Sequence, residues 1–389
     1  MFEFELQGQD GWARAWKFTT GHGSFETPIF MPVWTKATVK WISKEDLDTM
    51  GAQIILNNTY HLYLRPGDEI VRDFWWVHTF QSYDKPILTD SWGFQVFSLW
   101  DGKRSVWLSQ NTPLVKIEED GVHFRSVIDG SRHYFSPEKV MDIESNLGAD
   151  IIMAFDECAS WESSHEYAKK AMQRTHRWLE RCKNQWQLNE LKREDEWKYR
   201  QALFGIIQGV TYDDLRQESA DYVREMDTPW IAVGGLSVWE SKEDMYRTLD
   251  VLEPHLPKNK PHYLMGVWTP EDLVEWIARG IDMFDCVLPT RIGRHWMAFS
   301  WNGNVRIKNE KYKLSDKSLD PHCSCKVCKN YSLGYLRHLF QEDEMLWMQL
   351  LSYHNLYLLI DLSKQARWAI LERKYQDFRK KFWQNYSNT

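Results

Sequence analysis

Short runs of apolar residues recur along the chain, and each is bounded by turn-forming or polar residues. They occupy residues 28–33, 53–56, 86–89, 150–155, 203–207, 231–233, 262–265 and 283–288. Between most of them lie stretches with helical character, at 43–50, 137–147, 165–184, 212–226, 242–252 and 270–279. Continuous apolar strands that alternate with helices are typical of a parallel sheet covered by helices. Eight such units predict an α/β fold, the (β/α)8 TIM barrel.

Two helix starts carry clear local signals, because Ser136 precedes Pro137 and Thr269 precedes Pro270. Each pair is an N-cap residue followed by proline at the first helical position. Two segments break the alternation: one at about 100–134, with hairpin-type turns, and one at about 303–354, with a cysteine cluster. We therefore expect a barrel over 1–302 with a hairpin insertion at about 100–134. A zinc-binding and C-terminal helical lobe is expected over 303–389.

The distribution of charge changes this picture more than the net charge of -7 does. The segment 301–389 carries 15 Lys and Arg against 9 Asp and Glu, so this end is basic and the preceding 300 residues are acidic. A basic lobe suits a nucleic-acid partner, although charge alone fits an ordinary solvated helical surface equally well. No apolar run is long enough to span a membrane, and the N-terminus lacks the pattern of a secretion signal. We expect a soluble, cytoplasmic protein.

Three of the six cysteines crowd into the spacing Cys323-x-Cys325-x-x-Cys328. In a reducing compartment this spacing indicates a metal site rather than a disulfide framework. A histidine would complete a closed tetrahedral zinc site. Twenty-five residues separate Cys328 from His354, which lies in a helical stretch; His322 and His338 are competing ligands on spacing alone. The expected cofactor is one structural Zn2+ ion per subunit, since four protein ligands leave no place for a catalytic water.

Barrel enzymes carry their active sites at the C-terminal ends of the strands. The residues at or just past the ends of the predicted strands are Asp90, Asp156, Glu157, Gln208, Gly234, Gly235, Gly266 and Asp285. Paired carboxylates at one opening suit glycosidic chemistry, in which one acts as nucleophile and another moves protons. Amide, carboxylate and backbone groups suit the edge of an unstacked base. Any one of these acids could instead cap a neighbouring helix.

Eight segments of the chain resemble the motifs of the tRNA-guanine transglycosylases of bacterial type, also called queuine tRNA-ribosyltransferases. They include Thr89-Asp90-Ser91-Trp92-Gly93-Phe94-Gln95-Val96, Phe155-Asp156-Glu157-Cys158, Gly205-Ile206-Ile207-Gln208-Gly209 and Asp282-Met283-Phe284-Asp285-Cys286-Val287-Leu288-Pro289-Thr290-Arg291. The others lie at 58–62, 64–67, 232–236 and 263–267. The resemblance spans nearly the whole chain.

The resemblance implies a pentosyltransferase that exchanges guanine at the wobble position (34) of tRNAs with GUN anticodons for preQ1, 7-aminomethyl-7-deazaguanine. Asp285 would be the nucleophile that forms a covalent ribosyl intermediate, and Asp90 the proton acceptor. The implied base-binding residues are Asp90, Ser91, Trp92, Gly93, Phe94, Asp156, Gln208, Gly235, Leu236 and Met265. The implied contacts to the anticodon loop are Gly266, Val267, Trp268, Thr269, Pro270, Glu271, Asp272, Thr290, Arg291, Ile292, Gly293 and Arg294. Cys323, Cys325, Cys328 and His354 would hold zinc, and the family implies a homodimer.

Pocket size bears on the incoming base. Cys158 and Val238 match the bacterial form, which takes preQ1, whereas the eukaryotic form has a smaller residue in place of Val238 and takes queuine. PreQ1 is therefore the expected substrate.

Tryptophan is in excess, with 22 residues, while glycine, with 20, falls below the roughly 27 expected at its average share of about 7%. Several tryptophans stand where the family pattern carries glycine: Trp34, Trp75, Trp76, Trp92, Trp239, Trp268, Trp296 and Trp347. Glycine permits positive φ and close backbone approach, which an indole does not. Either the source organism reads the codon UGA as glycine, or the tryptophans are real and Trp92 crowds the base pocket.

Three functions follow from these patterns. The first is the active preQ1-inserting enzyme. The second is a non-catalytic tRNA-binding subunit of the same family, which applies if the tryptophans are real. The third is an unrelated barrel glycosidase, against which the cysteine cluster and the basic C-terminal end argue.

Overall fold

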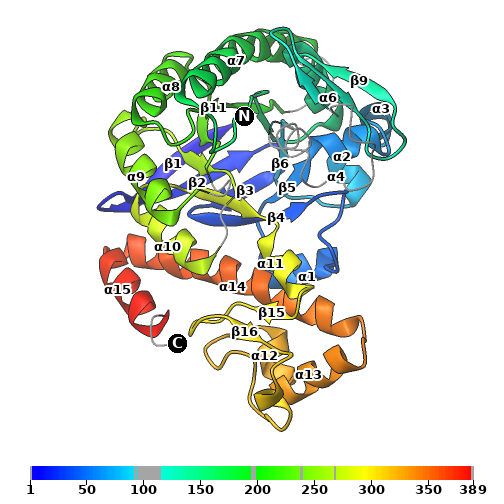
Figure 1. Ribbon diagram of the computed structural model, residues 1–389, viewed down its shortest axis with the longest axis vertical. Helices are drawn as coiled ribbons and strands as arrows, with labels where there is room; N and C mark the ends of the chain where they lie inside the picture. The colour runs from blue at the N-terminus through cyan, green and yellow to red at the C-terminus, as the bar shows by residue number, and fades with distance from the viewer. Residues whose placement is uncertain are drawn as a thin grey trace.

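The computed structural model describes residues 2–91, 93, 115–193, 199–236, 240–266 and 269–386. Within them, eight parallel strands close into a barrel (Figure 1). In barrel order the strands are β4 (Ile29–Trp34), β5 (Ile55–Asn58), β6 (Ile87–Asp90), β10 (Ile151–Met153), β11 (Ala202–Ile207), β12 (Trp230–Val233), β13 (His262–Leu264) and β14 (Met283–Cys286). Strand β14 pairs with β4 and completes the ring. The predicted (β/α)8 fold is confirmed.

Each strand overlaps the apolar run that predicts it, because all eight lie between the barrel interior and the covering helices. The prediction from the last run, residues 283–288, is the least accurate. Strand β14 ends at Cys286, and helix α11 (Leu288–Gly293) begins at the end of the run predicted as a strand. Pro289 sits near the start of this helix, where its missing N–H costs no hydrogen bond.

A sheet that the hydrophobic pattern did not predict covers the N-terminal end of the barrel. It is antiparallel and consists of β1 (Glu3–Asp10), β2 (Ala13–Thr20) and β3 (Gly23–Glu26). Phe18 and Phe25 of this sheet are fully buried and stack at a centroid distance of 4.8 Å. Phe18 also contacts Trp230 of β12 at 4.2 Å. The barrel is therefore closed at one end by aromatic side chains, which leaves the opposite end for chemistry.

Helices surround the barrel and begin where local signals predict them. The main ones are α1 (Lys44–Met50), α6 (Pro137–Leu147), α7 (His165–Arg193), α8 (Asp213–Glu225), α9 (Lys242–Leu252) and α10 (Pro270–Ala278). Ser136 accepts a hydrogen bond from the N–H of Lys139, and Thr269 accepts one from Asp272, so both predicted N-caps are confirmed. Smaller helices are α2 (Thr59–Leu64), α3 (Asp68–Asp73) and α4 (Trp76–Gln81).

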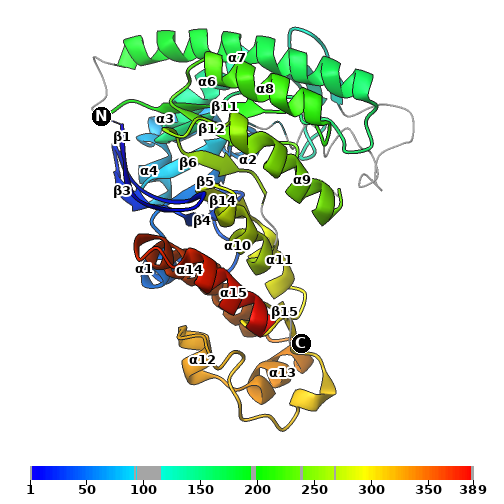
Figure 2. The ribbon, with the colours of Figure 1, turned by 90° about the vertical axis from the view of Figure 1, so that its left-hand side faces the viewer.

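The long helix α14 (Leu346–Leu371) completes the helical layer although it lies far along the chain. It packs on α1, α10, α11, β4 and the N-terminal sheet. Arg367 of this helix donates to the carbonyl oxygens of Trp16 and Thr27 at 3.0 and 2.6 Å. The final helix, α15 (Tyr375–Tyr386), packs on α10 and α14 (Figure 2). The C-terminal helices thus belong to the barrel's outer layer.

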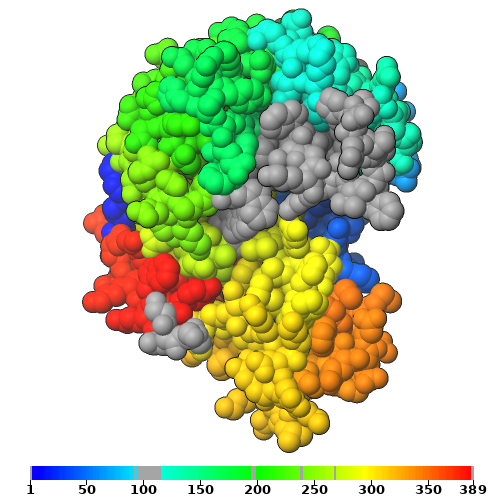
Figure 3. All heavy atoms as spheres, viewed as in Figure 1, coloured from blue at the N-terminus to red at the C-terminus, as the bar shows by residue number. Residues whose placement is uncertain are grey.

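Two insertions extend from the barrel. One contains the antiparallel sheet of β7 (Val115–Ile117), β8 (Val122–Arg125) and β9 (Arg132–Phe135). The other, between α11 and α14, contains β15 (Met297–Ala298), β16 (Val305–Arg306), α12 (Lys326–Asn330) and α13 (Leu333–Gln341). It projects from the barrel beyond α14 (Figures 2 and 3). In the part of the chain that the structure describes, no helix is both long and apolar enough to cross a lipid bilayer.

Candidate active site and metal centre

Carboxylates meet at the open end of the barrel because the strands that carry them are parallel. Asp90 is the last residue of β6, Asp285 lies in β14, and Asp156 follows β10 by three residues. Asp90 and Asp285 are half-buried, whereas Asp156 is buried. The phenol of Tyr263 on β13 lies close enough to both that the charges of Asp285 and Asp90 add to burial in raising the pKa of Tyr263. The two predicted catalytic acids therefore share one opening.

Asp285 is held through one of its two oxygens. Tyr263 donates its hydroxyl to Asp285 Oδ1 at 2.6 Å, and the backbone N–H of Gly266 donates to the same oxygen at 3.0 Å. Burial raises the pKa of Asp285, and these two hydrogen bonds oppose the shift because they favour the ionised form. A carboxylate fixed in this way presents its other oxygen, Oδ2, in one defined direction.

Asp90 is anchored by the strand next to it. Asn58 Nδ2 donates to Asp90 Oδ2 at 2.6 Å, and the backbone N–H of Thr59 donates to Oδ1 at 2.9 Å. Asn58 ends β5 and also caps α2, where its side chain accepts from the N–H of His61. The start of α2 therefore sets the orientation of Asp90.

Asp156 and Gln208 form a buried polar pair. Gln208 Nε2 donates to Asp156 Oδ2 at 2.6 Å, and Ser91 Oγ lies 3.4 Å from Oδ1. Burial raises the pKa of Asp156 to about 6, and the charge of neighbouring Glu157 adds to the shift. A cluster with carboxylate and amide oxygens and an amide N–H can match the donors and acceptors on the edge of a purine.

Glycines make room for this pair. A Cβ on Gly93 would lie 1.8 Å from Asp156 Oδ1, and a Cβ on Gly235 would lie 2.3 Å from Gln208 Oε1. Gly235 also has a φ of +63°, which an L side chain rarely adopts. Leu236 beside it is buried, and Met265 after β13 packs against the interior cluster of the barrel. Of the predicted base-binding residues, Trp92 and Phe94 lie outside the described residues.

Sequence reasoning missed the residues that support the site from behind. Arg216 of α8 is fully buried and donates to the carbonyl oxygens of Gly234 and Gly235 at 2.8 and 3.1 Å. It also donates to Ile207 and Val210, and so joins the loops that follow β11 and β12. Burial lowers the pKa of Arg216 to about 10, which still leaves it charged at neutral pH. Its spacing in a helix resembles that of any surface arginine, so the sequence carries no signal for this role.

The predicted RNA-contacting segments are only partly at the surface. Arg291 is exposed and Arg294 half-buried, while Thr290, Ile292 and Gly293 are buried. A Cβ on Gly293 would lie 2.9 Å from the backbone nitrogen of Ser352, so α11 packs tightly on α14 here. The structure therefore leaves the two arginines as the outward-facing groups of this segment.

The other predicted segment starts α10. Thr269 and Glu271 are half-buried, whereas Pro270 and Asp272 are buried. Lys242 pairs with Glu271 at 3.1 Å and with Asp272 at 2.9 Å. The side chain of Asp272 is thus committed to its own helix start and to Lys242. Val267 and Trp268 lie outside the described residues.

Cationic side chains gather beside α11. Burial lowers the pKa of Lys40, and the charges of Arg294 and Lys36 lower it further. Burial also lowers the pKa of Arg294, and the charge of Arg291 lowers it further. Among the residues that the structure describes, none of these four cations pairs with a carboxylate. Cations that repel one another in this way are typical of an anion-binding surface.

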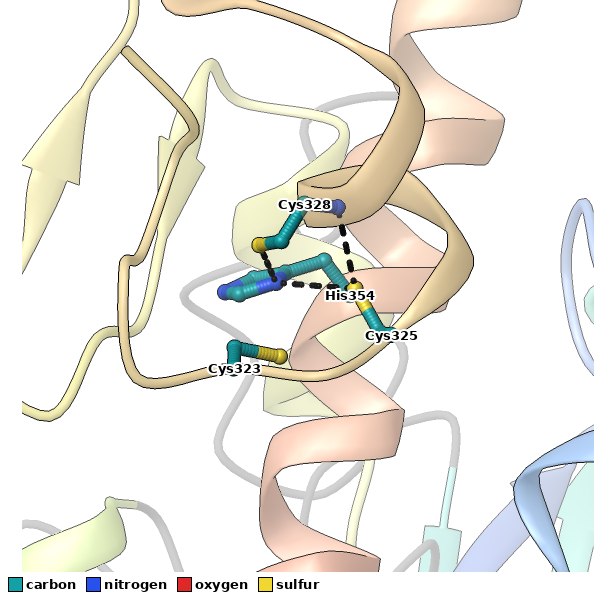
Figure 4. Close-up of side chains that lie close together, drawn as sticks. All are labelled: Cys323, Cys325, Cys328 and His354. Atoms are coloured by element: carbon teal, nitrogen blue, oxygen red, sulfur yellow. Dashed lines mark hydrogen bonds between the residues drawn. The ribbon is translucent and has the colours of Figure 1, made fainter.

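The three cysteines and His354 converge on one point (Figure 4). Their ligand atoms lie within 4.8 Å of one another. His354 Nδ1 lies 3.5 Å from Cys325 Sγ and 3.4 Å from Cys328 Sγ. Zinc bonds of about 2.3 Å to sulfur and about 2.0 Å to nitrogen give a tetrahedral edge of about 3.5 Å, so these distances suit an ion between the side chains.

His354 is fixed for coordination by a second contact. Its Nε2 lies 2.8 Å from the carbonyl oxygen of Phe299, so Nε2 carries the proton and Nδ1 turns its lone pair toward the thiols. The three thiol residues lie at the start of α12 and His354 on α14. In the described chain the ligand cluster contains His354 and neither His322 nor His338. Of the three candidate histidines, His354 is the one that the structure brings to the cysteines.

Comparison with known proteins agrees with this geometry. A family model described as queuine tRNA-ribosyltransferase matches residues 9–388. A queuine tRNA-ribosyltransferase of Ruminiclostridium cellulolyticum is 52% identical over 377 residues, which cover 97% of this chain and 95% of the relative. The enzyme of that name from Fusobacterium nucleatum is 49% identical over 385 residues, 98% of each chain. The hypothesis of an unrelated barrel glycosidase is therefore wrong. The chain belongs to the queuine tRNA-ribosyltransferase family, the tRNA-guanine transglycosylases, as its motifs predicted.

Proposed function

We propose that the protein exchanges guanine at the wobble position of tRNAs with GUN anticodons for preQ1, through a covalent intermediate on Asp285. The observation that carries this proposal is the pair of half-buried carboxylates, Asp285 and Asp90, at one barrel opening. The buried Asp156–Gln208 pair beside them offers groups for the edge of a purine.

The reaction consists of two displacements at C1′ of the same ribose. Asp285 Oδ2 attacks C1′, the C1′–N9 bond breaks, and guanine leaves with the bonding electrons and takes up a proton. Asp90 then accepts the N9 proton of preQ1, whose nitrogen attacks C1′ and breaks the bond to Asp285. The two hydrogen bonds on Oδ1 support the first step because they orient Oδ2 without neutralising it.

PreQ1 is the proposed incoming base because Cys158 and Val238 match the bacterial type. Cys158 is buried beside Asp156. Val238 lies outside the described residues. Guanine is the released base, and tRNA is bound through its anticodon loop.

RNA contact is proposed for Arg291 and Arg294, and the neighbouring Lys36 and Lys40 enlarge the same cationic surface. Gly266, Thr269 and Glu271 are half-buried, and the N–H of Gly266 donates to Asp285, so this segment is proposed to lie beside the bound RNA. The buried residues of these segments are proposed to hold the exposed residues in place rather than to contact RNA themselves.

The Cys323, Cys325, Cys328 and His354 cluster is proposed to hold one structural zinc ion. The four side chains come from α14 and from the inserted segment, so the ion would tie this segment to the barrel's helical layer. The proposed division is a barrel over 1–302 and a zinc-binding and helical lobe over 303–389, with α14 packed on both. A homodimer acting in the cytoplasm completes the proposal.

The decisive experiment compares wild-type protein with Asp285→Ala. We expect wild type to incorporate labelled guanine into tRNA and to form a denaturation-resistant adduct with it. Asp285→Ala should bind tRNA but form no adduct and show no exchange. Undiminished exchange by the variant would contradict the nucleophile assignment. Binding without exchange or adduct by wild type itself would favour the non-catalytic tRNA-binding subunit.

A further inference from the structure

A further carboxyl group lies close to Asp90 and is not part of the base-binding set. Glu144, on α6, is fully buried. Its Oε1 accepts a hydrogen bond from Thr59 Oγ1 at 3.0 Å, and its Oε2 contacts Thr89 Oγ1. Thr89 precedes Asp90 on β6, and the backbone N–H of Thr59 holds Asp90 Oδ1. Glu144 therefore joins the two backbone segments that orient Asp90.

The surroundings of Glu144 suit a neutral carboxylic acid. A buried carboxylate is stabilised by cations or by several N–H donors, whereas the hydrogen bonds to the Glu144 carboxyl group within the described residues come from two threonine hydroxyls. Thr89 Oγ1 also lies 3.3 Å from the carbonyl oxygen of Ile151, which can only accept. When the single proton of Thr89 goes to Ile151, Glu144 must donate the proton in its contact with Thr89. Burial raises the pKa of Glu144 well above its usual value, the charge of Asp90 raises it further, and Arg193 opposes the shift.

We propose that Glu144 is a positioning residue, kept protonated, that fixes the orientation of Asp90 through Thr59 and Thr89. This inference rests on the proposed role of Asp90 as proton acceptor. A neutral Glu144 serves that role in two ways. It holds both segments by hydrogen bonds, and it adds no negative charge that would favour protonation of Asp90.

Three variants separate positioning from general stability. Glu144→Gln keeps the shape, stays neutral and can donate to Thr89 while accepting from Thr59, so exchange and its pH profile should match wild type. Glu144→Ala removes both hydrogen bonds, and we expect kcat to fall about 10- to 100-fold with KM for tRNA unchanged. Ile143→Ala is the matched control, because Ile143 is buried next to Glu144 on the same helix and its apolar side chain cannot hydrogen-bond to either threonine. It should lose stability but retain kcat.

The outcomes are distinct. Equal kcat in Glu144→Ala and Ile143→Ala would overturn the positioning role, and a Glu144→Gln variant as impaired as Glu144→Ala would overturn the neutral state. Infrared difference spectra of wild type against Glu144→Gln at pH 7 add a readout independent of activity. A protonated carboxylic C=O band supports the inference, and an ionised carboxylate signature refutes it. If wild type shows no exchange, the proposed function fails, while the spectra still decide the charge state.

A second inference comes from the backbone. Among the described residues, ten that are not glycine have positive φ, and four of them are tryptophans: Trp41 (φ 69°), Trp75 (61°), Trp76 (70°) and Trp296 (55°). This conformation is rare for bulky residues and costs an L-residue roughly 1–2 kcal/mol. Tryptophan makes up only 22 of 389 residues, so it is strongly enriched in the conformation that favours glycine.

Other tryptophans behave as ordinary core residues. Trp178 is buried in α7, stacks on Phe155 at a centroid distance of 4.7 Å, and donates its indole N–H to the carbonyl oxygen of Glu119 at 2.7 Å. Trp75, in contrast, is 71% exposed, and both Trp75 and the next residue, Trp76, have positive φ. Among the described residues, Trp178 is therefore used by the fold as an indole, whereas Trp41, Trp75, Trp76 and Trp296 have the backbone conformation that favours glycine.

We infer that Trp41, Trp75, Trp76 and Trp296 are glycines in the protein made by its own cell, through reading of the UGA codon as glycine. The test is the mass of the peptide that covers positions 75 and 76, from protein purified from native cells. A peptide lighter by two tryptophan-to-glycine differences supports the inference. A peptide with the mass of two tryptophans overturns it. The peptide that contains Trp178 serves as the internal control and should carry tryptophan.

Discussion

Replacing Trp75 by glycine and, separately, by alanine measures the backbone cost of tryptophan at this position. Both variants lose the same indole, so the contribution of its partial burial cancels in the comparison. The difference between the two variants then reports the backbone preferences of glycine and alanine at this left-handed position, with φ 61° and ψ 47°. Trp75 suits this comparison because it is 71% exposed and its removal leaves no cavity in the core.

The expected magnitude follows from two opposing contributions. The left-handed conformation costs alanine roughly 1–2 kcal/mol and glycine almost nothing. Glycine loses more chain entropy on folding, which favours alanine by about 0.4–1 kcal/mol. We therefore expect Trp75→Gly to be more stable than Trp75→Ala by roughly 0.5–1 kcal/mol. Urea titrations of the purified proteins measure this difference from the two midpoints, provided that both variants share one m value.

The matched control is Trp368, which is 68% exposed but lies within the helix α14. There the order should reverse, with Trp368→Ala more stable than Trp368→Gly by about 0.8–1 kcal/mol. The reasoning is refuted if alanine is as stable as glycine at position 75. It is also refuted if glycine is favoured equally at both positions, because the effect would then not depend on φ.

Three further predictions concern the site. Burial raises the pKa of Asp156 to about 6, so the stability that its proton contributes is fully present below pH 3.8 and is lost as the pH rises through about 6. Guanine affinity should change in the opposite direction and weaken below about pH 6. Asp156→Asn should abolish both pH dependences, as measured by urea titration and by binding titration. Cys323→Ser should contain no zinc by elemental analysis, and its segment between α11 and α14 should become sensitive to protease. His322→Ala should keep both the bound zinc and the protease resistance. Arg291→Ala and Arg294→Ala should each weaken tRNA binding and reduce the slope of log affinity against log salt by about 0.7, and an unchanged slope would place these cations outside the RNA contact.

Local sequence determined the elements of this protein and the order in which they occur. The apolar runs predicted the eight strands because each is buried on both faces, and the capping residues Ser136 and Thr269 marked helix starts because their hydrogen bonds are local. Parallel strands end at one face of a barrel, so Asp90, Asp156, Gln208 and Asp285 could be grouped without coordinates. The spacing of Cys323, Cys325 and Cys328 predicted three members of the cluster that could hold a metal ion, because these residues are close in sequence.

Tertiary structure alone decided which distant groups meet. It brought His354 rather than His322 or His338 to the cysteines, because α14 packs both on the barrel and on α12. It placed Glu144 close to Asp90 and Arg216 beneath two loops, although neither residue is near its partners in sequence. It also closed the barrel with β1, β2 and β3, whose aromatic residues meet Trp230 of β12. Contacts of this kind depend on how helices and strands pack against one another, and the pattern along a single segment reports burial and period but not the identity of the neighbour.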